Sequence, residues 1–132
     1  MSGKVLYISY DGMTDPLGQS QVIPYLQGLS KHGYKITLLS FEKKLRFQKL
    51  SPQIRALLDE SGIEWEPLFF SKRPPLLAKI YDIWRMQRLA KKLHKRRKFD
   101  LVHCRSYVSA EAGLRLWKQH KVPFLFDMRG FW

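Results

Sequence analysis

The sequence predicts an α/β domain with a doubly wound, parallel, Rossmann-like sheet of about five strands. Short apolar runs of strand length alternate with longer segments of helical periodicity along the 132 residues. The first run, residues 5–10, is continuously apolar, as in a strand that is covered on both faces. The chain is the size of one domain, and its 45% hydrophobic content suits a globular core. Parallel strands with right-handed helical crossovers follow from the alternation, with an expected strand order of 3-2-1-4-5.

The first half of the chain contains two strand–helix units. After the strand at residues 5–10, a turn-rich loop leads into a helical pattern with Pro24 near its first turn, where the missing N–H costs nothing, and with Gly33 as a left-handed stop. The second unit has a strand at residues 36–41, then a basic segment and a helical pattern that ends at Gly62. The apolar positions that define the two helices are Val22, Tyr25, Leu26 and Leu29, then Ile54, Leu57 and Leu58.

The second half of the chain continues the alternation. Pro74 and Pro75 break the chain before the longest helical pattern in the sequence. We expect the remaining elements to be a strand at residues 63–70, a helix at 76–97, a strand at 99–104, a helix at 110–120 and a strand at 122–127.

Composition excludes several classes of protein. The single cysteine, Cys104, excludes an internal disulfide framework and a Cys-based zinc site, and we expect it to pack as a small apolar side chain. The four histidines are scattered without a carboxylate cluster, so we expect no metal site. No apolar stretch approaches the ~20 residues that span a bilayer, and residues 1–4 lead directly into a strand and not into a signal peptide. These features predict a cytoplasmic protein.

The loop after the first strand is the first candidate site, because ligands of doubly wound sheets bind beyond the carboxyl ends of the strands. Residues 11–20 do not form a Walker loop, since Gln19 stands where that loop needs Lys, and they lack the three-glycine dinucleotide pattern. Gly18 remains, just before a helix N-terminus whose amides and dipole suit a phosphate or carboxylate. In the alternative interpretation, Gly18 only makes a turn and Ser20 only caps the helix.

Two further strand ends reach the same edge of the predicted sheet. His103 and Arg105 close the fourth strand, with Tyr107 just beyond it, and Asp127 and Arg129 follow the fifth strand. Two arginines, a histidine and an aspartate suit an anionic or sugar-like ligand, since Arg is a forked donor and Asp accepts from hydroxyls. The alternative is scaffolding, in which Asp127 pairs with Arg105 or Arg129 and His103 is a structural residue.

Positive charge is concentrated in residues 72–98, where eleven Lys or Arg face one acid, Asp82, and give +10 of the net +13. On a helix, one face of this segment is apolar and is expected to cover the sheet, and the opposite face suits an anionic lipid surface. The alternatives are a solvated helix whose aromatic residues pack under a neighbouring loop, and nucleic acid, which is less favoured because no nucleic-acid module accompanies the stripe. The sheet-facing set is Leu76, Ile80, Ile83, Met86, Ala90 and Leu93, and the outward set is Leu77, Tyr81, Trp84, Arg88, Lys91, Lys92 and Lys95.

Three stretches, residues 4–43, 99–118 and 122–132, resemble the N-terminal domain of family 4 glycosyltransferases of the GT-B fold, whereas residues 44–98 match only in pattern. The resemblance implies a retaining enzyme whose substrate is a nucleotide-sugar donor, with no cofactor and no metal. It implies that Gly18, Gln19 and Ser20 face the donor diphosphate and that Arg105 and Tyr107 line the interdomain cleft. His103, Asp127 and Arg129 are then the catalytic candidates, and Arg129 stands where many members have a histidine.

The resemblance also sets expectations for the domain organisation. We expect residues 1–132 to be the N-terminal, acceptor-side domain, incomplete at its C-terminus, with the C-terminal donor-binding domain absent and with no activity of the chain alone. The expected acceptor is a glycan or a lipid-linked acceptor in polysaccharide biosynthesis, at the inner face of the cell membrane. An uncovered sheet edge also favours self-association. The competing hypothesis is a non-catalytic basic α/β module that binds anionic membranes or polyanions.

Overall fold

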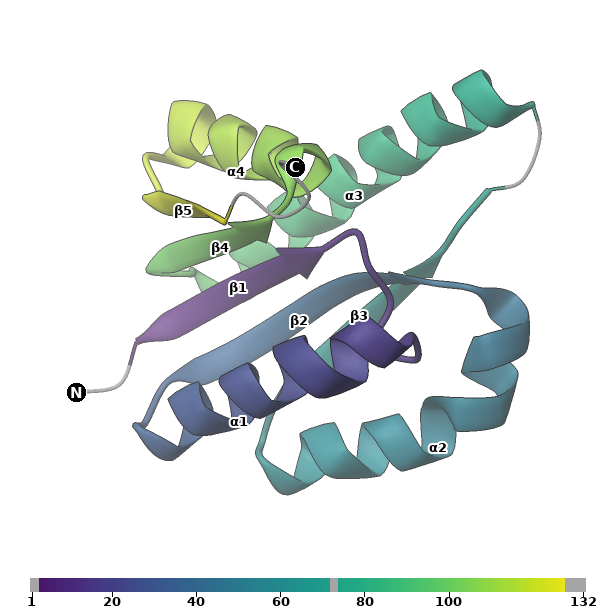
Figure 1. Ribbon diagram of the computed structural model, residues 1–132. Helices are drawn as coiled ribbons and strands as arrows, with labels where there is room; N and C mark the ends of the chain where they lie inside the picture. Colours follow the sequence, from purple (N-terminus) through teal and green to yellow (C-terminus); the bar gives the residue numbers. More distant parts are fainter. Residues whose placement is uncertain (1–2, 72–73, 128–132) are drawn as a thin grey trace.

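A computed structural model describes residues 3–71 and 74–127 of the chain. Its centre is one parallel sheet with the strand order β3-β2-β1-β4-β5 (Figure 1). The fold class and the strand order predicted from the sequence are therefore confirmed. The strands are β1 (Lys4–Ser9), β2 (Lys35–Glu42), β3 (Glu64–Phe69), β4 (Leu101–Arg105) and β5 (Phe124–Asp127).

Helices cover both faces of the sheet, two on each side (Figure 1). On one face, Leu26 of the first helix and Leu58 of the second pack on the strands. On the other face, Met86 of the third helix and Leu116 of the fourth do the same. The helices are α1 (Ile23–Lys31), which follows the π-helical turn η1 (Gly18–Val22), then α2 (Lys44–Glu60), α3 (Pro75–Arg97) and α4 (Tyr107–His120).

Burial on both faces explains why β1 has a continuous apolar run. Leu6 and Ile8 point into the core under α3 and α4, whereas Val5 and Tyr7 point into the core under α1 and α2. All four side chains are at most 5% exposed. A strand in this position gains from an apolar residue at every place and not only at alternate ones.

Pro24 lies in the first turn of α1, as the sequence predicts, but helical backbone begins before α1. Helical backbone starts at Pro16, passes through η1 and continues as α1, so Pro24 lies inside the segment. The missing N–H of Pro24 removes the α-helical bond to the Ser20 carbonyl, and the wider π turn lies just before it, where Ile23 donates to the Gly18 carbonyl. A local π turn thus accommodates the proline without ending the helix.

For the first turns of α3, the residues that the sequence pattern predicts to be buried are wrong. Leu76 and Ile80 were expected to cover the sheet, but they are 73% and 56% exposed. The reason is that α3 begins beyond the carboxyl edge of the sheet, so its first turns have no strand beneath them (Figure 1). The buried positions are Ala78, Asp82, Met86, Ala90, Leu93 and His94, and Ile83 packs against the core as a partly buried residue.

Asp82 fastens α3 to the end of β3. Its carboxylate, 1% exposed, accepts from the Ser71 amide at 3.0 and 3.2 Å and forms an ion pair with Arg85 at 2.6 Å. Asp82 is the one acid of the basic segment, and its contacts fix where the helix leaves the sheet.

Within residues 3–71 and 74–127, no helix has both the length and the apolar composition needed to cross a membrane.

Candidate functional site

Arg105 joins the end of β4 to the loop after β1. The residue is 3% exposed, and its Nε donates to Asp11 Oδ2 at 3.3 Å. Its Nη2 donates to Gln21 Oε1 in η1 at 3.1 Å. A buried guanidinium that makes two directed bonds is a rigid connection. The structure therefore brings together the first two of the three strand ends that the sequence predicts to meet.

Tyr7 lies beneath this connection, in the middle of β1. Burial raises the pKa of the Tyr7 phenol to about 12, while the charge of Arg105 and its hydrogen bond to the phenol act in the opposite direction. The phenol is therefore neutral at pH 7 and remains a hydrogen-bond donor. Its ring contacts the His103 ring, with the centroids 4.5 Å apart.

His103 of β4 and Asp127 at the end of β5 lie close together at the carboxyl edge of the sheet. His103 Nε2 lies 3.7 Å from Asp127 Oδ2, and the imidazole is also flanked by the Tyr25 ring at 5.7 Å. His103 is 6% exposed, and the Asp127 side chain is 27% exposed. An imidazole beside a half-buried carboxylate can donate or accept a proton and can bind sugar hydroxyls.

Ser106, between β4 and α4, has a strained backbone. Its φ of 97° and ψ of 165° belong to a region that is almost restricted to glycine. Its amide donates to the Asp127 carbonyl at 3.0 Å, which holds the ends of β4 and β5 together. Among the described residues, its buried hydroxyl has no hydrogen-bond partner. Strain of this kind concentrates at functional sites, and the location of Ser106 agrees with that rule.

The turn before η1 is held by a buried carboxylate. Glu42, the last residue of β2, is 0% exposed and accepts from the amides of Met13 at 2.8 Å and of Thr14 at 3.1 Å. It also accepts from the Thr14 hydroxyl at 2.9 Å and contacts the Ser40 hydroxyl. Three loop donors on one carboxylate fix the path of the chain from β1 to the helix.

Close backbone packing requires glycine at position 18. A Cβ at this position would lie 2.2 Å from the Gly12 carbonyl oxygen and 2.7 Å from the Met13 Cα. Gly18 is not among the residues with positive φ, so its need for glycine comes from the backbone against which it packs. The loop that the sequence singles out thus fits directly against the turn that Glu42 holds.

The other two residues of the predicted diphosphate loop are exposed. Gln19 uses its side-chain amide to bind the Thr14 carbonyl at 3.1 Å, and its backbone amide donates to the Asp15 carbonyl. The interpretation of Ser20 as a helix cap is wrong, because helical backbone already begins at Pro16.

Two predicted site residues cannot be placed with the rest. Tyr107 is the first residue of α4, but its side chain lies outside the described part of the chain, and Arg129 lies wholly outside it. Cys104 packs as predicted: it is fully buried against Gly113, and burial raises its thiol pKa to about 12. Within residues 3–71 and 74–127, no group of three His, Cys, Asp or Glu could hold a metal ion.

Sequence reasoning missed Asp11, Gln21 and Glu42. A signal existed for Glu42, which is a carboxylate at the end of a mostly apolar strand. Asp11 follows the first strand directly, at the edge already chosen for the search. Gln21 had no signal, because a polar residue in the first turn of a helix is ordinary.

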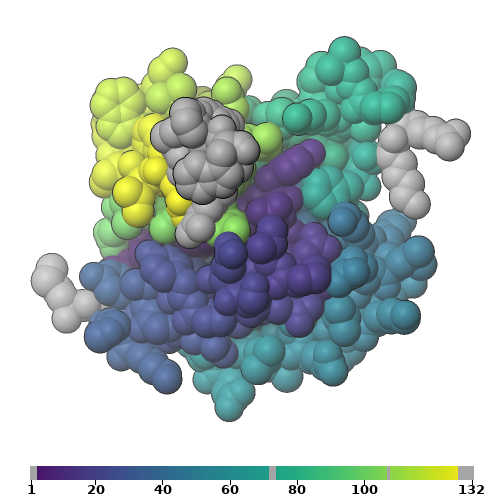
Figure 2. Space-filling model, viewed as in Figure 1, coloured from purple at the N-terminus to yellow at the C-terminus, as the bar shows by residue number. Residues whose placement is uncertain are grey.

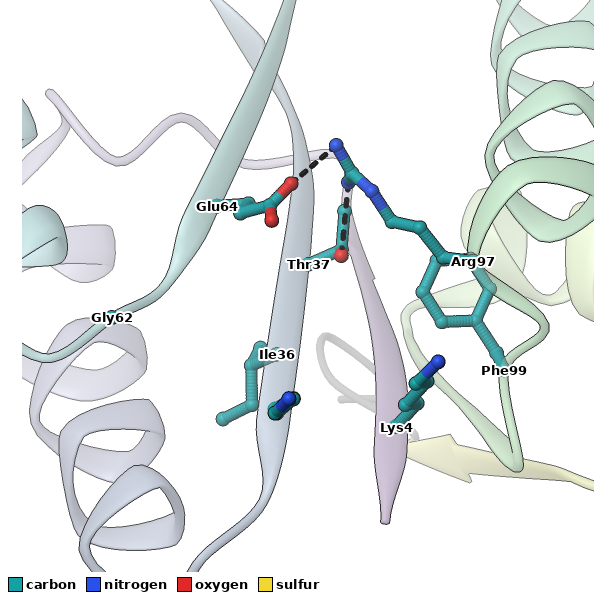
Figure 3. Close-up of a pocket in the computed structure, with 8 residues that line it drawn as sticks. Lys4, Ile36, Thr37, Gly62, Glu64, Arg97 and Phe99 are labelled. Atoms are coloured by element: carbon teal, nitrogen blue, oxygen red, sulfur yellow. Dashed lines mark hydrogen bonds and ion pairs between the residues drawn. The ribbon is translucent and has the colours of Figure 1, made fainter. Parts of the chain in front are cut away.

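A cavity of about 400 Å³ lies at the opposite, amino edge of the sheet (Figure 3). Arg97 reaches across it to the Thr37 hydroxyl at 3.1 Å and forms an ion pair with Glu64. Its guanidinium also lies 3.4 Å from Glu66. Arg97 is therefore engaged by the sheet at this cavity, and the carboxyl edge, where ligands of doubly wound sheets bind, remains the candidate site.

The outward face of α3 is a second candidate surface. Tyr81 and Trp84 are 51% and 50% exposed and stack on each other, so the interpretation that they pack under a neighbouring loop is wrong. Leu77 is also exposed, on the same stripe. The predicted basic positions, Arg88, Lys91, Lys92 and Lys95, are all exposed. Figure 2 shows the N-terminal part of α3 standing out from the body of the domain.

Comparisons with known proteins agree with the fold and point to a family. A profile of the family described as Glycosyltransferase Family 4 matches residues 20–132. A structure described as the glycotransferase of kitacinnamycin has a TM-score of 0.63 at 15% identity, and the alignment covers 95% of this chain and 30% of that one. No curated protein sequence matches the chain.

Two other solved structures share the fold at low identity. The C-terminal domain of a Pyrococcus furiosus hydrogenase has a TM-score of 0.69 at 20% identity, with 96% of this chain and 91% of that one covered. A universal stress protein in complex with cAMP has a TM-score of 0.50 at 10% identity, with 97% and 98% covered. At such identities the likeness concerns the fold alone.

Proposed function

This chain belongs to Glycosyltransferase Family 4, and on that premise we propose that it is the N-terminal, acceptor-side domain of a retaining glycosyltransferase. The full enzyme would transfer a sugar from a nucleotide-sugar donor to a glycan or a lipid-linked acceptor. One observation carries the proposal: the Arg105 guanidinium binds Asp11 and Gln21 at the carboxyl edge of the sheet, beside His103 and Asp127. Ligands of doubly wound sheets bind at this edge.

The residues divide into two groups by the part of the donor that each would meet. The loop that contains Gly18, Gln19 and Ser20 would face the diphosphate, at the start of a helical segment whose dipole favours negative charge. His103 and Asp127 would face the transferred sugar and accept or donate at its hydroxyls. Arg105 and Tyr107 would line the cleft, and Arg129 would be a third catalytic candidate beside His103 and Asp127. Transfer would rest on positioning and on electrostatic stabilisation of the leaving diphosphate.

The nucleotide itself would be held mainly by a second, donor-binding domain. The alignment with the kitacinnamycin structure spans 30% of that chain. We therefore expect the 132-residue chain alone to bind donor fragments weakly and not to catalyse transfer. Turnover of a nucleotide-sugar by the purified chain would contradict this part of the proposal.

We further propose that the full enzyme works at the inner face of the cell membrane, with the exposed stripe of α3 on anionic lipid. The stripe has Leu77, Tyr81 and Trp84 at its start and Arg88 and Lys91 further along. Apolar and aromatic side chains beside cations suit the boundary between headgroups and acyl chains. A non-catalytic module that binds polyanions would use the same cations but would not need the exposed apolar residues.

Calorimetric titration of the chain with uridine diphosphate and inorganic pyrophosphate tests the donor-facing edge. We expect both ligands to bind, with a several-fold loss of affinity in Arg105→Gln, because this substitution releases Asp11 and Gln21. The control Arg96→Gln removes the same charge from an exposed position on α3 and should change affinity less than twofold. Equal losses in the two variants would show that only overall charge attracts the ligand, which contradicts the proposed site.

A further inference from the structure

A groove of about 250 Å³ lies between α3 and α4. Trp84, Arg88 and Lys91 line it from α3, and Arg115 lines it from α4. Gln87 and Gln119 add one side-chain amide from each helix. Ala112 and Leu116, both buried, also line the groove from α4. The groove is therefore an opening between two helices with an apolar base and polar, cationic walls.

The groove carries positive charge that nothing in it neutralises. Arg88, Lys91 and Arg115 line it, and no carboxylate does. Within residues 3–71 and 74–127, none of these three cations takes part in an ion pair. Converging cations with amide donors match the oxygens of a phosphate group, which accept hydrogen bonds on every side.

Trp84 connects this groove to the outward stripe of α3. The Arg88 guanidinium lies over the Trp84 ring, 5.1 Å from its centroid, and the Trp84 ring also stacks with the exposed Tyr81 ring, with the centroids 6.0 Å apart. Tryptophan side chains settle at the level of lipid headgroups, where one part of the ring is apolar and another can hydrogen-bond. With Trp84 at that level, Leu77 would reach the acyl chains and the groove would face the phosphates.

We infer that the α3–α4 groove binds the phosphate of an anionic phospholipid headgroup. The inference rests on the membrane association proposed above and deepens it, because it names a defined site in place of a diffuse attraction. Arg88 and Arg115 hold the phosphate from the two helices, and Lys91 with the two glutamines completes the set of donors. The surface thus recognises a headgroup as well as a negative potential.

Co-sedimentation with vesicles of 30% phosphatidylglycerol in phosphatidylcholine tests the groove. We compare the double variant Arg88→Gln/Arg115→Gln with Arg96→Gln/Lys118→Gln, which removes the same charge from exposed positions outside the groove. The groove variant should lose tenfold or more in vesicle affinity, and the control less than threefold. Equal losses in the two double variants would overturn the groove while leaving membrane association in place.

Two further measurements distinguish a failure of the groove proposal from a failure of the membrane association on which it rests. No vesicle binding by the unaltered chain would overturn both the membrane association and the groove. Soluble dihexanoyl phosphatidylglycerol and inorganic phosphate are then titrated while amide shifts are followed by NMR. Shifts at Arg88 and Arg115 with the lipid support the inference. Equal shifts with inorganic phosphate at the same concentration would overturn the assignment to a lipid headgroup.

Discussion

The carbonyl oxygen of Gly12 lies 2.2 Å from the place where a Cβ at Gly18 would stand. This contact packs the start of the helical segment onto the turn after β1, and it leaves no room for a side chain. The turn itself is held by Glu42 from the neighbouring strand. The candidate diphosphate loop is therefore rigid because of two interactions within the protein.

Gly18→Ala should lower the free energy of unfolding by about 2–4 kcal/mol, because the added methyl meets backbone atoms that cannot move aside cheaply. The matched control is Gly28→Ala in α1, where a Cβ meets nothing within 4 Å. This control should gain up to about 1 kcal/mol from helix propensity. Urea unfolding measures both variants, and a stability of Gly18→Ala equal to that of the unaltered chain would refute the packing argument.

Glu42→Gln should destabilise the protein by about 2–4 kcal/mol. The carboxamide replaces one acceptor oxygen with a donor that faces either the Met13 or the Thr14 amide, so one buried N–H loses its partner. Glu60→Gln, at an exposed position of α2, should change stability by less than about 0.5 kcal/mol. Hydrogen exchange at Met13 and Thr14 should accelerate in Glu42→Gln, and unchanged protection there would contradict the proposed role.

Ser106→Gly should raise stability by about 1 kcal/mol or more, because glycine adopts a φ of 97° without strain. Ser106→Ala keeps the strained backbone and should not bring this gain. Thermal unfolding of the two variants is compared with that of the unaltered chain. If glycine and alanine have the same effect, the backbone of Ser106 is not the source of strain.

Stability should fall as the pH rises from about 10 to about 12. Burial raises the pKa of folded Tyr7 from 10.0 to about 12, so above pH 10 the unfolded chain loses a proton that the folded chain keeps. The stabilisation is thus complete below pH 10 and is lost as the pH approaches the folded value, up to about 3 kcal/mol for a shift of this size. Tyr7→Phe should flatten this part of the curve.

Cys104 contributes to the same alkaline loss, because burial raises its pKa from 9.0 to about 12. The loss of stability due to Cys104 begins nearer pH 9, where the thiol of the unfolded chain ionises. The double variant Tyr7→Phe/Cys104→Ala should therefore have the flattest stability profile from pH 9 to pH 12. A double variant as steep as the unaltered chain would contradict the assignment.

The order of the strands followed from the sequence because alternation and handedness leave few other arrangements. The exposure of Leu76 and Ile80 could not be predicted, since periodicity shows which side chains share a face but not where the sheet beneath them ends. The role of Glu42 could not be predicted for a related reason. Its partners are loop amides 28 and 29 positions away, and no local pattern records such a contact.

The sequence predicts the location of the candidate site better than it predicts the contacts within it. The topology rule placed His103, Arg105 and Asp127 at one edge, and there His103 lies 3.7 Å from Asp127 and Arg105 donates to Asp11. The π turn before α1 could not be predicted from the sequence, because Pro24 indicates only the first turn of α1, where it does lie. That turn places Gln21 where it can bind Arg105. Without the turn, the contact between Gln21 and Arg105 could not be predicted either.

The most direct test of the donor-facing carboxyl edge is an NMR titration of the ¹⁵N-labelled chain with a nucleotide-sugar such as UDP-glucose. We predict that the largest amide shifts occur at Gly18, Gln19 and Arg105, at the carboxyl ends of β1 and β4, with little change at Gly62 beside the opposite edge. Shifts concentrated around Gly62 and Arg97, with none at Gly18 and Arg105, would contradict the account.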